Sequence, residues 1–493
     1  MDSPILSSAQ MHAAEEAAIA RGVNVETLMD QAGAGVAQAI EQFFPDPGTC
    51  IVFAGKGHNG GDALVAAEQL KRRGWKIDLR LPLGEEDCSE LTRKKLKAFR
   101  DASESASAAT GERPVVLDGL LGTGAKSFLR EPIRSAAREI NRLREKNAFV
   151  FALDLPTGMD ADSGEVDPED SVAADFTVTI GFAKHGLIVD PALDFVRRIE
   201  VVPLPDLAPE ITLRNELAAT PHSLNALFPR RKFSAYKNQF GRVGVVAGSK
   251  GFIGAALMTT QGALRAGAGL VEVFVPEEIY EAVASAAPVE AMVKPIRKYR
   301  DLIDEKMDVW AVGPGLGKSR ASEILNLIEN AAQPMVVDAD GLNILADKID
   351  ILKRCRGPRL LTPHPGEIQR LFDVGKMVRA GIARNFCEQF PVTLLFKGSR
   401  TIVCERGKPI SYNTTGNPGM ATGGMGDVLT GVCAGLAGRQ LSMYDAARIG
   451  AWVCGRAAEI SIFNFGASEE SLLASDVLAN LGEAFNDLRN PRA

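Results

Sequence analysis

Short apolar runs alternate with longer amphipathic stretches in the first part of the chain. An apolar run at 50–54 leads into a glycine-rich loop, a helical pattern at 63–73 and a second apolar run at 76–81. This order predicts a strand–helix–strand unit. The same logic predicts further strands at 114–117, 149–153, 176–180 and 199–202, and further helices at 8–20, 27–43 and 132–144. Such alternation is typical of a doubly wound α/β domain with a mostly parallel sheet.

The alternation restarts after residue 241. Strands are predicted at 242–247, 270–275, 309–312, 335–337 and 360–361, with a small-residue helix at 255–266 and later helices from 427, at 443–460 and at 474–488. Three closely spaced runs, 392–396, 401–405 and 409–412, predict an antiparallel meander at the edge of the sheet. A polar, proline-containing stretch at 203–221 predicts a linker. We therefore expect two α/β domains, 1–212 and 213–493.

Composition narrows the possible partners. The chain has 493 residues, 46% of them hydrophobic, and a formal net charge of −6 without any block of like charge. This argues against nucleic acid or an anionic membrane as the main partner. There is no apolar run long enough to span a bilayer, and the N-terminal sequence lacks the pattern of a secretory signal. The seven scattered cysteines form no C-x-x-C pair, which favours a reducing, cytoplasmic location.

The 48 glycines cluster where the predicted strands end. In the first domain, GKGHNG (55–60) matches G-x-G-x-x-G, but no acidic residue ends the next strand, so an ordinary Rossmann NAD site is not expected. Asp62, Asp118 and Asp154 instead fall at or just beyond predicted strand ends. Each alone could be a cap or turn residue, but together they predict a ligand site at one edge of the sheet. Lys126, which follows the loop after Asp118, could act at this site as a general acid or could contact an anion.

Three motifs, AGKGHNGGDALVAA, DGLLGTGAK and DLPTGMDADSG, resemble the YjeF N-terminal family, the NAD(P)H-hydrate epimerases. The resemblance implies a Rossmann-like, three-layer αβα fold with a bound potassium ion. It implies Asn59, Asp118 and Thr157 as potassium ligands. It also implies substrate contacts from Asn59, Gly60, Gly61, Asp62, Gly122, Thr123, Gly124, Ala125, Lys126, Ser127, Phe128 and Asp154. Asp154 and Lys126 are our candidates for the acid–base pair.

The chain departs from that family at three positions. Ala63 replaces the last glycine of the loop, Thr157 replaces the usual serine, and His58 stands where an asparagine is common. Threonine keeps the hydroxyl oxygen, so we expect potassium binding to be retained. A methyl group at Ala63 is tolerable unless the substrate needs that space.

In the second domain, Gly423, Gly424 and Gly426 precede Asp427 at a predicted helix start. Their backbone N–H groups and the helix dipole can hold a phosphate in transfer. Asp427 is then placed to accept a hydroxyl proton. An isolated G-x-G-D would more often be a turn with an aspartate cap. Lys397 after a strand and the other glycine loops favour the phosphate site.

The segments 240–276, VGPGLG, VVDADGLNIL, LLTPHPGE and GGMGDVLTG are similar to the YjeF C-terminal family, nucleotide-dependent NAD(P)H-hydrate dehydratases with a ribokinase-like α/β fold. The resemblance implies nucleotide contacts from Lys397, Gly398, Ser399, Arg400, Thr401 and Gly426. It implies contacts to hydrated nicotinamide from Ala255, Gly315, Gly317, His364 and Asp427. His364 is equally well explained as a surface group. Asp338 and Asp340 could be ligand contacts or metal-water partners, and Asp340 equally a turn residue.

The two resemblances together predict a bifunctional repair enzyme. One domain would epimerise hydrated NADH and NADPH, and the other would dehydrate one epimer with Mg²⁺ and ADP or ATP. Bacterial members, which are fused in this way, are associated with ADP, so we favour ADP. The alternatives are a small-molecule kinase of the hydroxymethylpyrimidine or sugar type with an accessory first domain, and a first domain that only binds or scaffolds. A homo-oligomer is possible, although helix packing within the domain is the default.

Overall fold

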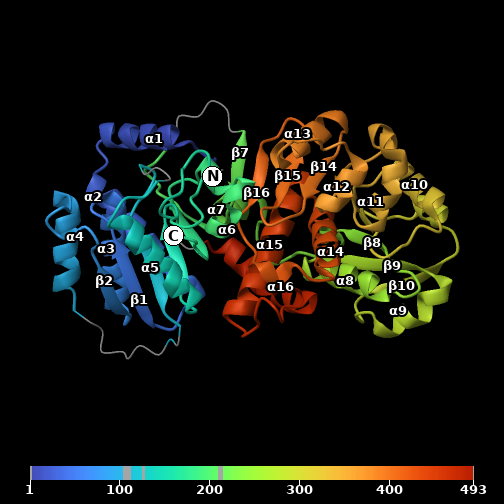
Figure 1. The fold of residues 1–493 in the computed structure, drawn as a ribbon. Coiled ribbons are helices and arrows are strands. Elements are labelled where there is room, and N and C mark those ends of the chain that lie inside the picture. The colour runs from blue at the N-terminus through green and yellow to red at the C-terminus, as the bar shows by residue number, and fades with distance from the viewer. Residues whose placement is uncertain (1–2, 104–110, 112, 125–127, 209–214, 492–493) are drawn as a thin grey trace. The chain divides into compact units, whose positions relative to one another are not determined.

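The computed structural model describes residues 3–103, 111, 113–124, 128–208 and 215–491. The chain divides into two compact units, Ser3–Arg214 and Asn215–Pro491. Each unit is an α/β structure built on one sheet (Figure 1). Ala125, Lys126 and Ser127 lie outside the described residues.

The N-terminal unit contains a six-stranded sheet in the order β2-β1-β3-β4-β5-β6. All neighbouring strands are parallel. The strands are β1 (Thr49–Ala54), β2 (Lys76–Arg80), β3 (Val115–Gly119), β4 (Phe149–Leu153), β5 (Phe176–Ile180) and β6 (Arg198–Val202). Since the strands run in the same direction, the loops after β1, β3 and β4 share one edge of the sheet.

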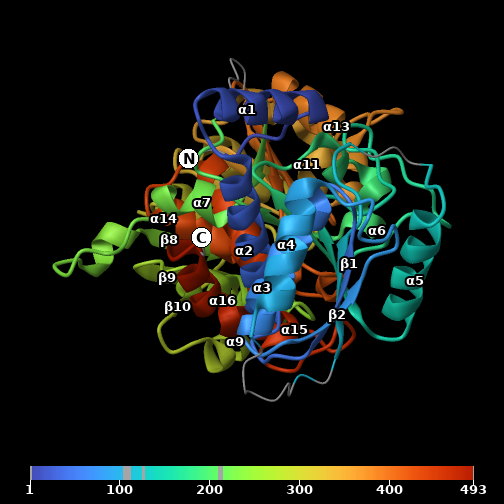
Figure 2. The same cartoon turned by 90° about the vertical axis from the view of Figure 1, so that its left-hand side faces the viewer.

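Helices cover both faces of this sheet, as Figure 2 shows for α3 and α4 on one side of β1 and β2 and α5 on the other. Phe43 of α2 packs on Phe176, with ring centroids 4.3 Å apart. On the opposite face, Ile140 of α5 belongs to one buried cluster with Val116 and Val150. The helices are α1 (Ser8–Ala20), α2 (Val25–Phe43), α3 (His58–Arg72), α4 (Glu90–Asp101), α5 (Ile133–Glu145) and α6 (Leu193–Val196).

In this unit the predicted start of one helix was wrong, and another helix was not predicted. Helix α3 begins at His58 rather than at 63, so the glycine motif forms its first turn. A Cβ on Gly60 would lie 1.8 Å from the carbonyl oxygen of Gly55, so only glycine allows the helix to start this close to β1. Helix α4 was missed because its sequence is mostly charged. Its first turn is capped by Ser89, whose Oγ accepts a 3.2 Å hydrogen bond from the Thr92 N–H.

The C-terminal unit contains a ten-stranded sheet in the order β10-β9-β8-β11-β12-β13-β14-β15-β16-β7. Only β15 runs antiparallel to its neighbours. The strands are β7 (Glu216–Ala219), β8 (Arg242–Val246), β9 (Leu270–Pro276), β10 (Met292–Ile296), β11 (Val309–Val312), β12 (Met335–Val337), β13 (Arg359–Leu361), β14 (Thr393–Phe396), β15 (Ile402–Glu405) and β16 (Ile410–Asn413).

Helices α8 and α14 pack closely against each other on one face of this sheet. A Cβ on Gly431 of α14 would lie 2.0 Å from the carbonyl oxygen of Thr259 in α8. Small residues therefore set the distance between the two helices. The helices of this unit are α7 (Pro221–Leu224), α8 (Ile253–Arg265), α9 (Tyr280–Ala286), α10 (Ala321–Asn330), α11 (Asp340–Leu345), α12 (Pro365–Leu371), α13 (Arg379–Gln389), α14 (Met425–Gly438), α15 (Met443–Phe463) and α16 (Ala474–Arg489).

The predicted linker at 203–221 contains a strand. Residues Glu216–Ala219 form β7, which pairs in parallel with β16. The meander β14–β15–β16 is antiparallel as predicted, but it does not end the sheet, because β7 covers β16. Four residues carry too little pattern to predict a strand from the sequence. No helix within the described residues is long and apolar enough to cross a membrane.

Candidate active sites

The end of β3 places Asp118 against the loop after β4. The Asp118 carboxylate accepts hydrogen bonds from the Thr157 N–H at 2.9 Å and from the Thr157 hydroxyl at 2.7 Å. The same hydroxyl accepts a bond from the Leu121 N–H at 3.2 Å. Burial raises the pKa of Asp118 to about 6, although these hydrogen bonds lower it. Two of the three implied potassium ligands thus lie in direct contact.

Asp154 follows β4 in a left-handed backbone conformation, with φ of 69°. Such a conformation is strained for a residue other than glycine and is common at functional sites. Its carboxylate accepts hydrogen bonds from the Lys184 ammonium group and from the Ile180 N–H, the latter at 3.2 Å. Lys184 is fully buried and also donates to the Thr179 hydroxyl at 3.0 Å. Lys184 was not predicted as a site residue, although this lysine follows the predicted strand at 176–180.

The loop after β3 brings Asn59 and Asp154 to the same place. A Cβ on Gly122 would lie 3.2 Å from Asn59 Oδ1 and 3.4 Å from Asp154 Oδ2. The Asn59 Nδ2 atom is buried without a hydrogen-bond partner among the described residues. This amide can therefore donate to a ligand that enters beside Gly122. Phe128, also implied as a substrate contact, is exposed.

A group of acidic side chains surrounds this place. Asp62 lies within α3 rather than at its start. Burial and the carboxylates of Asp154 and Glu15 raise the pKa of Asp62 well above its ordinary range, while Lys184 acts in the opposite direction. Glu15 comes from α1 and was not predicted. Ala63, the departure from the family loop, is fully buried. The Ala63 methyl group packs on Gly119 of β3, where an added Cβ would lie only 2.3 Å from the Ala63 Cβ.

In the C-terminal unit, Asp338 and Lys397 meet at the ends of β12 and β14. Lys397 Nζ lies 2.8 Å from Asp338 Oδ1, and the Thr430 hydroxyl of α14 donates to Asp338 Oδ2 at 2.8 Å. Burial opposes the charge of Lys397, but Asp338 and Glu367 outweigh it, so the pKa of Lys397 is raised. Glu367 Oε2 lies 3.8 Å from the ammonium group. Glu367 was not predicted as a site residue.

The start of α14 lies over this ion pair. Gly424 caps the helix with φ of 88°, and a Cβ on Gly426 would lie 3.3 Å from Asp338 Oδ2 and 3.4 Å from Lys397 Nζ. Asp427 stands in the first turn. Burial and the carboxylate of Asp338 raise the pKa of Asp427 to about 6, while Lys397 acts to lower it. The glycines, Asp427 and Lys397 are thus brought together as the sequence suggested.

Two further predicted groups take distinct places. His364 is half-exposed and caps α12, where its Nδ1 accepts hydrogen bonds from the Gly366 and Glu367 N–H groups. In the stretch 397–401, Gly398 has φ of 157° and the Thr401 hydroxyl donates to its carbonyl oxygen at 3.2 Å. Ser399 is exposed and Arg400 is buried.

The loop after β11 carries the remaining predicted residues. A Cβ on Gly315, whose φ is 64°, would lie 3.0 Å from the Cβ of Ala255. The Gly317 N–H donates to Asp340 Oδ2 at 2.8 Å. Asp340, at the start of α11, therefore shapes this loop. Ala255 and Gly315 are adjacent, as a shared substrate surface requires.

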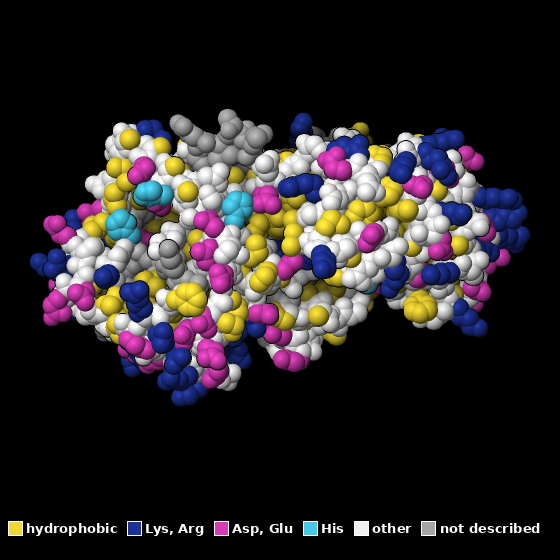
Figure 3. All heavy atoms as spheres, turned by 45° about the horizontal axis from the view of Figure 1, so that its top comes forward, with side chains coloured by type: hydrophobic (Ala, Val, Ile, Leu, Met, Phe, Trp, Pro, Cys, Tyr) yellow, Lys and Arg dark blue, Asp and Glu magenta, His cyan; other side chains and the backbone are white. Residues whose placement is uncertain are grey.

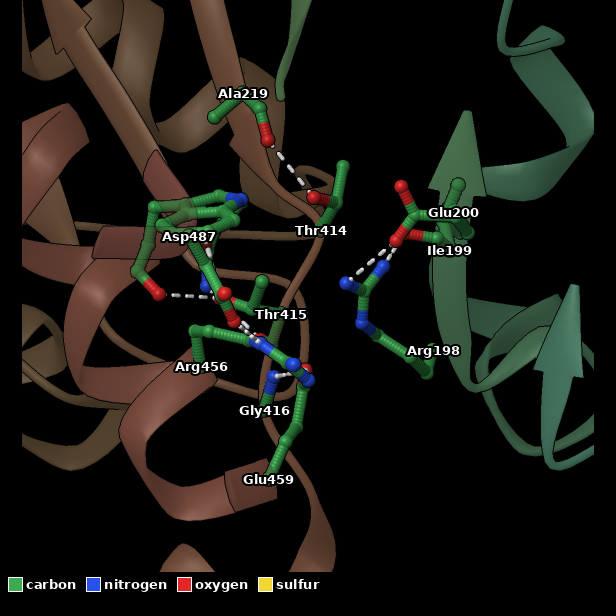
Figure 4. A network of polar contacts seen from close by, with 12 residues as sticks. Arg198, Ile199, Glu200, Ala219, Thr414, Thr415, Gly416, Arg456, Glu459 and Asp487 are labelled. Atoms are coloured by element: carbon green, nitrogen blue, oxygen red, sulfur yellow. Dashed lines mark hydrogen bonds and ion pairs between the residues drawn. The ribbon is translucent and has the colours of Figure 1, made fainter. Parts of the chain in front are cut away.

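A buried charge network holds the chain that leads to α14. Figure 4 shows Arg456 between Glu459 and Asp487, and Glu459 in contact with Gly416. Arg456 Nε donates to Asp487 Oδ2 at 2.7 Å, and the Gly416 N–H donates to Glu459 Oε1 at 2.8 Å. The Thr415 hydroxyl donates to the Trp452 carbonyl oxygen at 2.8 Å. The residues of this charge network were not predicted as site residues from the sequence.

Both units thus present buried carboxylates and glycine loops at the carboxyl edge of a parallel sheet, the usual place for enzyme sites in α/β proteins. Residues 25–186 match the family model described as YjeF-related protein N-terminus. Residues 243–480 match the model described as NAD(P)H-hydrate dehydratase.

Full-length relatives match nearly the whole chain. The chain is 34% identical to the bifunctional NAD(P)H-hydrate repair enzyme Nnr of Moorella thermoacetica, over 92% of this chain and 90% of that protein. It is 33% identical to the enzyme of the same name from Escherichia coli K12, over 96% and 92%. A crystal structure of ADP/ATP-dependent NAD(P)H-hydrate dehydratase from Bacillus subtilis, co-crystallised with ATP/Mg²⁺, matches with 27% identity and a TM-score of 0.49. It covers 55% of this chain and 97% of that one. The chain belongs to the family of bifunctional NAD(P)H-hydrate repair enzymes.

Proposed function

We propose that the C-terminal unit dehydrates hydrated NADH and NADPH by first phosphorylating the ring hydroxyl. Asp427 carries this proposal. It stands at the start of α14, beside the Asp338–Lys397 pair, and its pKa of about 6 leaves it ionised at neutral pH. A carboxylate in this position can accept the hydroxyl proton as phosphorus is attacked.

The chemistry proceeds in two steps. The ring hydroxyl oxygen forms a bond to the terminal phosphorus of the donor, the bond to the donor's bridging oxygen breaks, and Asp427 takes the proton. The ring nitrogen lone pair then expels phosphate, and loss of a proton from the neighbouring ring carbon restores the reduced nicotinamide. With ADP the sum is hydrated NADH plus ADP giving NADH, AMP, phosphate and a proton.

The donor would lie along 397–401, with its terminal phosphate at the N–H groups of α14. Lys397 and Gly426 adjoin each other there, and the helix dipole favours the negative charge. Mg²⁺ would accompany the nucleotide. We infer ADP as the donor because the chain has the fused arrangement of its Moorella and Escherichia relatives, and bacterial members of the resembled family are associated with ADP.

We assign the epimerase reaction to the N-terminal unit, with Asp154 as the group that exchanges a proton with the substrate. When Asp154 donates a proton to the hydroxyl, the ring nitrogen lone pair expels it as water and a ring iminium ion forms; water then adds to the opposite face of the ring and returns a proton to Asp154, so one proton donor and acceptor is enough. Asp154 and the Asn59 amide both face Gly122. Lys184 is buried beneath Asp154 and acts as a positioning residue. The earlier candidate Lys126 lies outside the described residues.

Potassium fits the donors around Asp118. Hard cations prefer oxygen ligands, and Asp118, Thr157 and Asn59 all offer side-chain oxygens. A bound cation would supply positive charge beside a buried carboxylate, whose pKa is raised to about 6 by burial. Within the described residues no group of three or more His, Cys, Asp or Glu could hold a metal, so the amide and hydroxyl oxygens are needed. The seven cysteines are free thiols, which supports a cytoplasmic location.

One assay tests both assignments. A mixture of the two epimers of hydrated NADH is incubated with the full chain, Mg²⁺, K⁺ and either ADP or ATP, and the return of NADH absorbance is followed. We expect full recovery of both epimers with ADP. Recovery of one epimer, with the rest drifting at the spontaneous rate, would contradict the epimerase assignment. No recovery with either nucleotide would contradict the dehydratase and favour a small-molecule kinase.

A further inference from the structure

The C-terminal unit contains a pocket whose lining includes Gly317 but no other residue to which a role was given above. Its volume is about 430 Å³, which is within the range that holds a small ligand. It lies beyond the ends of β9 and β10, between the loop after β11 and the start of α10. Its lining includes Ser249, Arg297, Tyr299, Gly317, Ser319 and Arg320.

The pocket and the proposed substrate site share the loop after β11. Gly317 lines it, and the same loop places Gly315 against Ala255. The Ser249 hydroxyl, also in the lining, donates to the Gly315 carbonyl oxygen at 2.7 Å. A ligand at Asp427 that extends along this loop therefore reaches the pocket.

The distance suits a dinucleotide. Asp338 follows β12. In the sheet, β9 lies three strand positions from β12, and β10 lies four positions from it. With about 4.8 Å between neighbouring strands, the pocket lies roughly 15–20 Å along the sheet edge from the reacting centre. A single nucleotide cannot span this distance, whereas two nucleotides joined by pyrophosphate can. The proposed nucleotide donor lies toward β14, on the other side of that centre.

The pocket offers a flat cationic surface. The Arg320 guanidinium lies over the Tyr299 ring, 5.4 Å from its centroid, and donates to the Arg297 carbonyl oxygen at 2.5 Å. Tyr299 is buried beneath it. Arg320 contacts a carbonyl oxygen and the Tyr299 ring, both of which are uncharged, so neither contact offsets its positive charge. Arg297, in contrast, forms an ion pair with Glu277 at 2.8 Å. A planar guanidinium stacks well on a nucleobase.

Basic residues surround the pocket. Lys and Arg side chains gather at the end of the unit that carries β10 and α10 (Figure 3). The exposed or partly exposed members in the adjoining loops are Arg297, Lys298, Arg300, Lys318 and Arg320. Glu277 and Glu278 also line the pocket, and Glu277 is paired with Arg297, so Lys298, Lys318 and Arg320 are the basic groups that can meet the phosphates of a dinucleotide.

From these observations we infer that the pocket receives the adenosine half of the hydrated dinucleotide, with adenine stacked on Arg320. The inference rests on the proposed dehydratase function and adds a binding subsite to it. The nicotinamide half would lie at Asp427, and the pyrophosphate would cross the loop 313–317.

The test compares a whole substrate with half a substrate. Hydrated NADH and hydrated reduced nicotinamide mononucleotide are each turned over by the full chain, with ADP saturating. In Arg320→Ala we expect the KM for hydrated NADH to rise about tenfold, with the KM for the mononucleotide unchanged. Ser319→Trp, which fills the mouth of the pocket, should give the same selective rise. Arg354→Ala, an exposed arginine outside the lining, serves as the matched control and should change neither value.

Each other outcome is decisive. Equal changes for both substrates, or no change for either, would overturn the pocket assignment while leaving the proposed function intact. A raised KM for ADP instead would place the donor in the pocket and overturn it too. If the unaltered chain turned over neither substrate, the proposed function would fail, and this inference would fail with it.

Discussion

At the scale of single residues, the proton acceptor of the dehydratase sets a pH limit. The pKa of Asp427 is raised to about 6 by burial and by Asp338. Its carboxylate is the active form, so kcat/KM should fall as the pH drops below about 6 and level off above it. Asp427→Asn should lower kcat by about 10²–10⁴-fold and remove this acid limb. A pH series from 5 to 8 checks the profile, and an unchanged acid limb in Asp427→Asn would reject the assignment.

The Asp154–Lys184 pair allows a double-mutant cycle. Lys184→Met leaves a buried carboxylate without its cation, which typically costs about 3–5 kcal/mol of unfolding free energy, and it should abolish epimerisation. The double variant Asp154→Asn with Lys184→Met removes both charges and should be more stable than Lys184→Met alone. Denaturant unfolding measures the stabilities. A Lys184→Met chain that still epimerised at the normal rate would show that Lys184 does not position Asp154.

Which site residues the sequence could predict depended on where they lie along the chain. Asp118, Asp154 and Asp427 stand in or beside glycine motifs, and the structure places each at a sheet edge. Lys184 approaches the first site from the segment after β5, Glu15 approaches it from α1, and Glu367 approaches the second site from α12. Lys184 and Glu15 stand in none of the quoted motifs, and Glu367 ends the motif LLTPHPGE without being singled out, so only tertiary packing shows that these three residues reach the sites. The places of the three aspartates at the sheet edges could be predicted, whereas the buried and half-buried side chains around them could not.

At the scale of elements, the α8–α14 contact makes its own prediction. Gly431→Ala would place a Cβ 2.0 Å from the Thr259 carbonyl oxygen, and such overpacking costs about 1–3 kcal/mol. Because α14 carries Asp427, we also expect a loss of dehydratase activity. Gly482→Ala in α16 is the matched control, since nothing lies within 4 Å of its added Cβ. It should stabilise the chain by about 0.5–1 kcal/mol. Thermal unfolding of both variants would decide, and equal effects would reject the packing argument.

Strong periodicity made most elements predictable, and the exceptions have physical reasons. The α1 range matched the expected residues 8–20 although its periodicity is weak, because Ser7 and Gln10 form a capping box at its start and Gly22 follows its end with φ of 94°. Strand β7 is four residues long and is stabilised by pairing with β16. Helix α3 starts within the glycines because its backbone must approach β1. A pairing distant in sequence therefore decided β7, whereas close backbone packing between Gly60 and the nearby Gly55 decided the start of α3.

At the scale of the molecule, each unit has its own sheet and should respond to its own ligand. The folded pKa of Asp118, about 6, lies above its ordinary value of 3.8. The folded state therefore holds the extra proton, and this group reduces stability as the pH rises from about 4 to about 6. Potassium would offset that loss, so K⁺ should raise the melting temperature of the N-terminal unit more at pH 8 than at pH 5. Scanning calorimetry in K⁺ against a tetramethylammonium salt measures this, and Asp118→Asn should remove the difference.

Two sites on one chain also make a prediction about transfer between them. The epimerase changes only the configuration of a small, diffusible molecule, so the dehydratase does not need to receive it from the same chain. A chain with Asp427→Asn should epimerise without producing NADH, and a chain with Asp154→Asn should return only one epimer beyond the spontaneous rate. An equimolar mixture of the two should restore full recovery of both epimers, at a rate that rises with the concentration of either chain. If only the unaltered chain recovered both epimers, and the mixture of the two variants did not, the epimer would have to pass directly from one site to the other within one molecule.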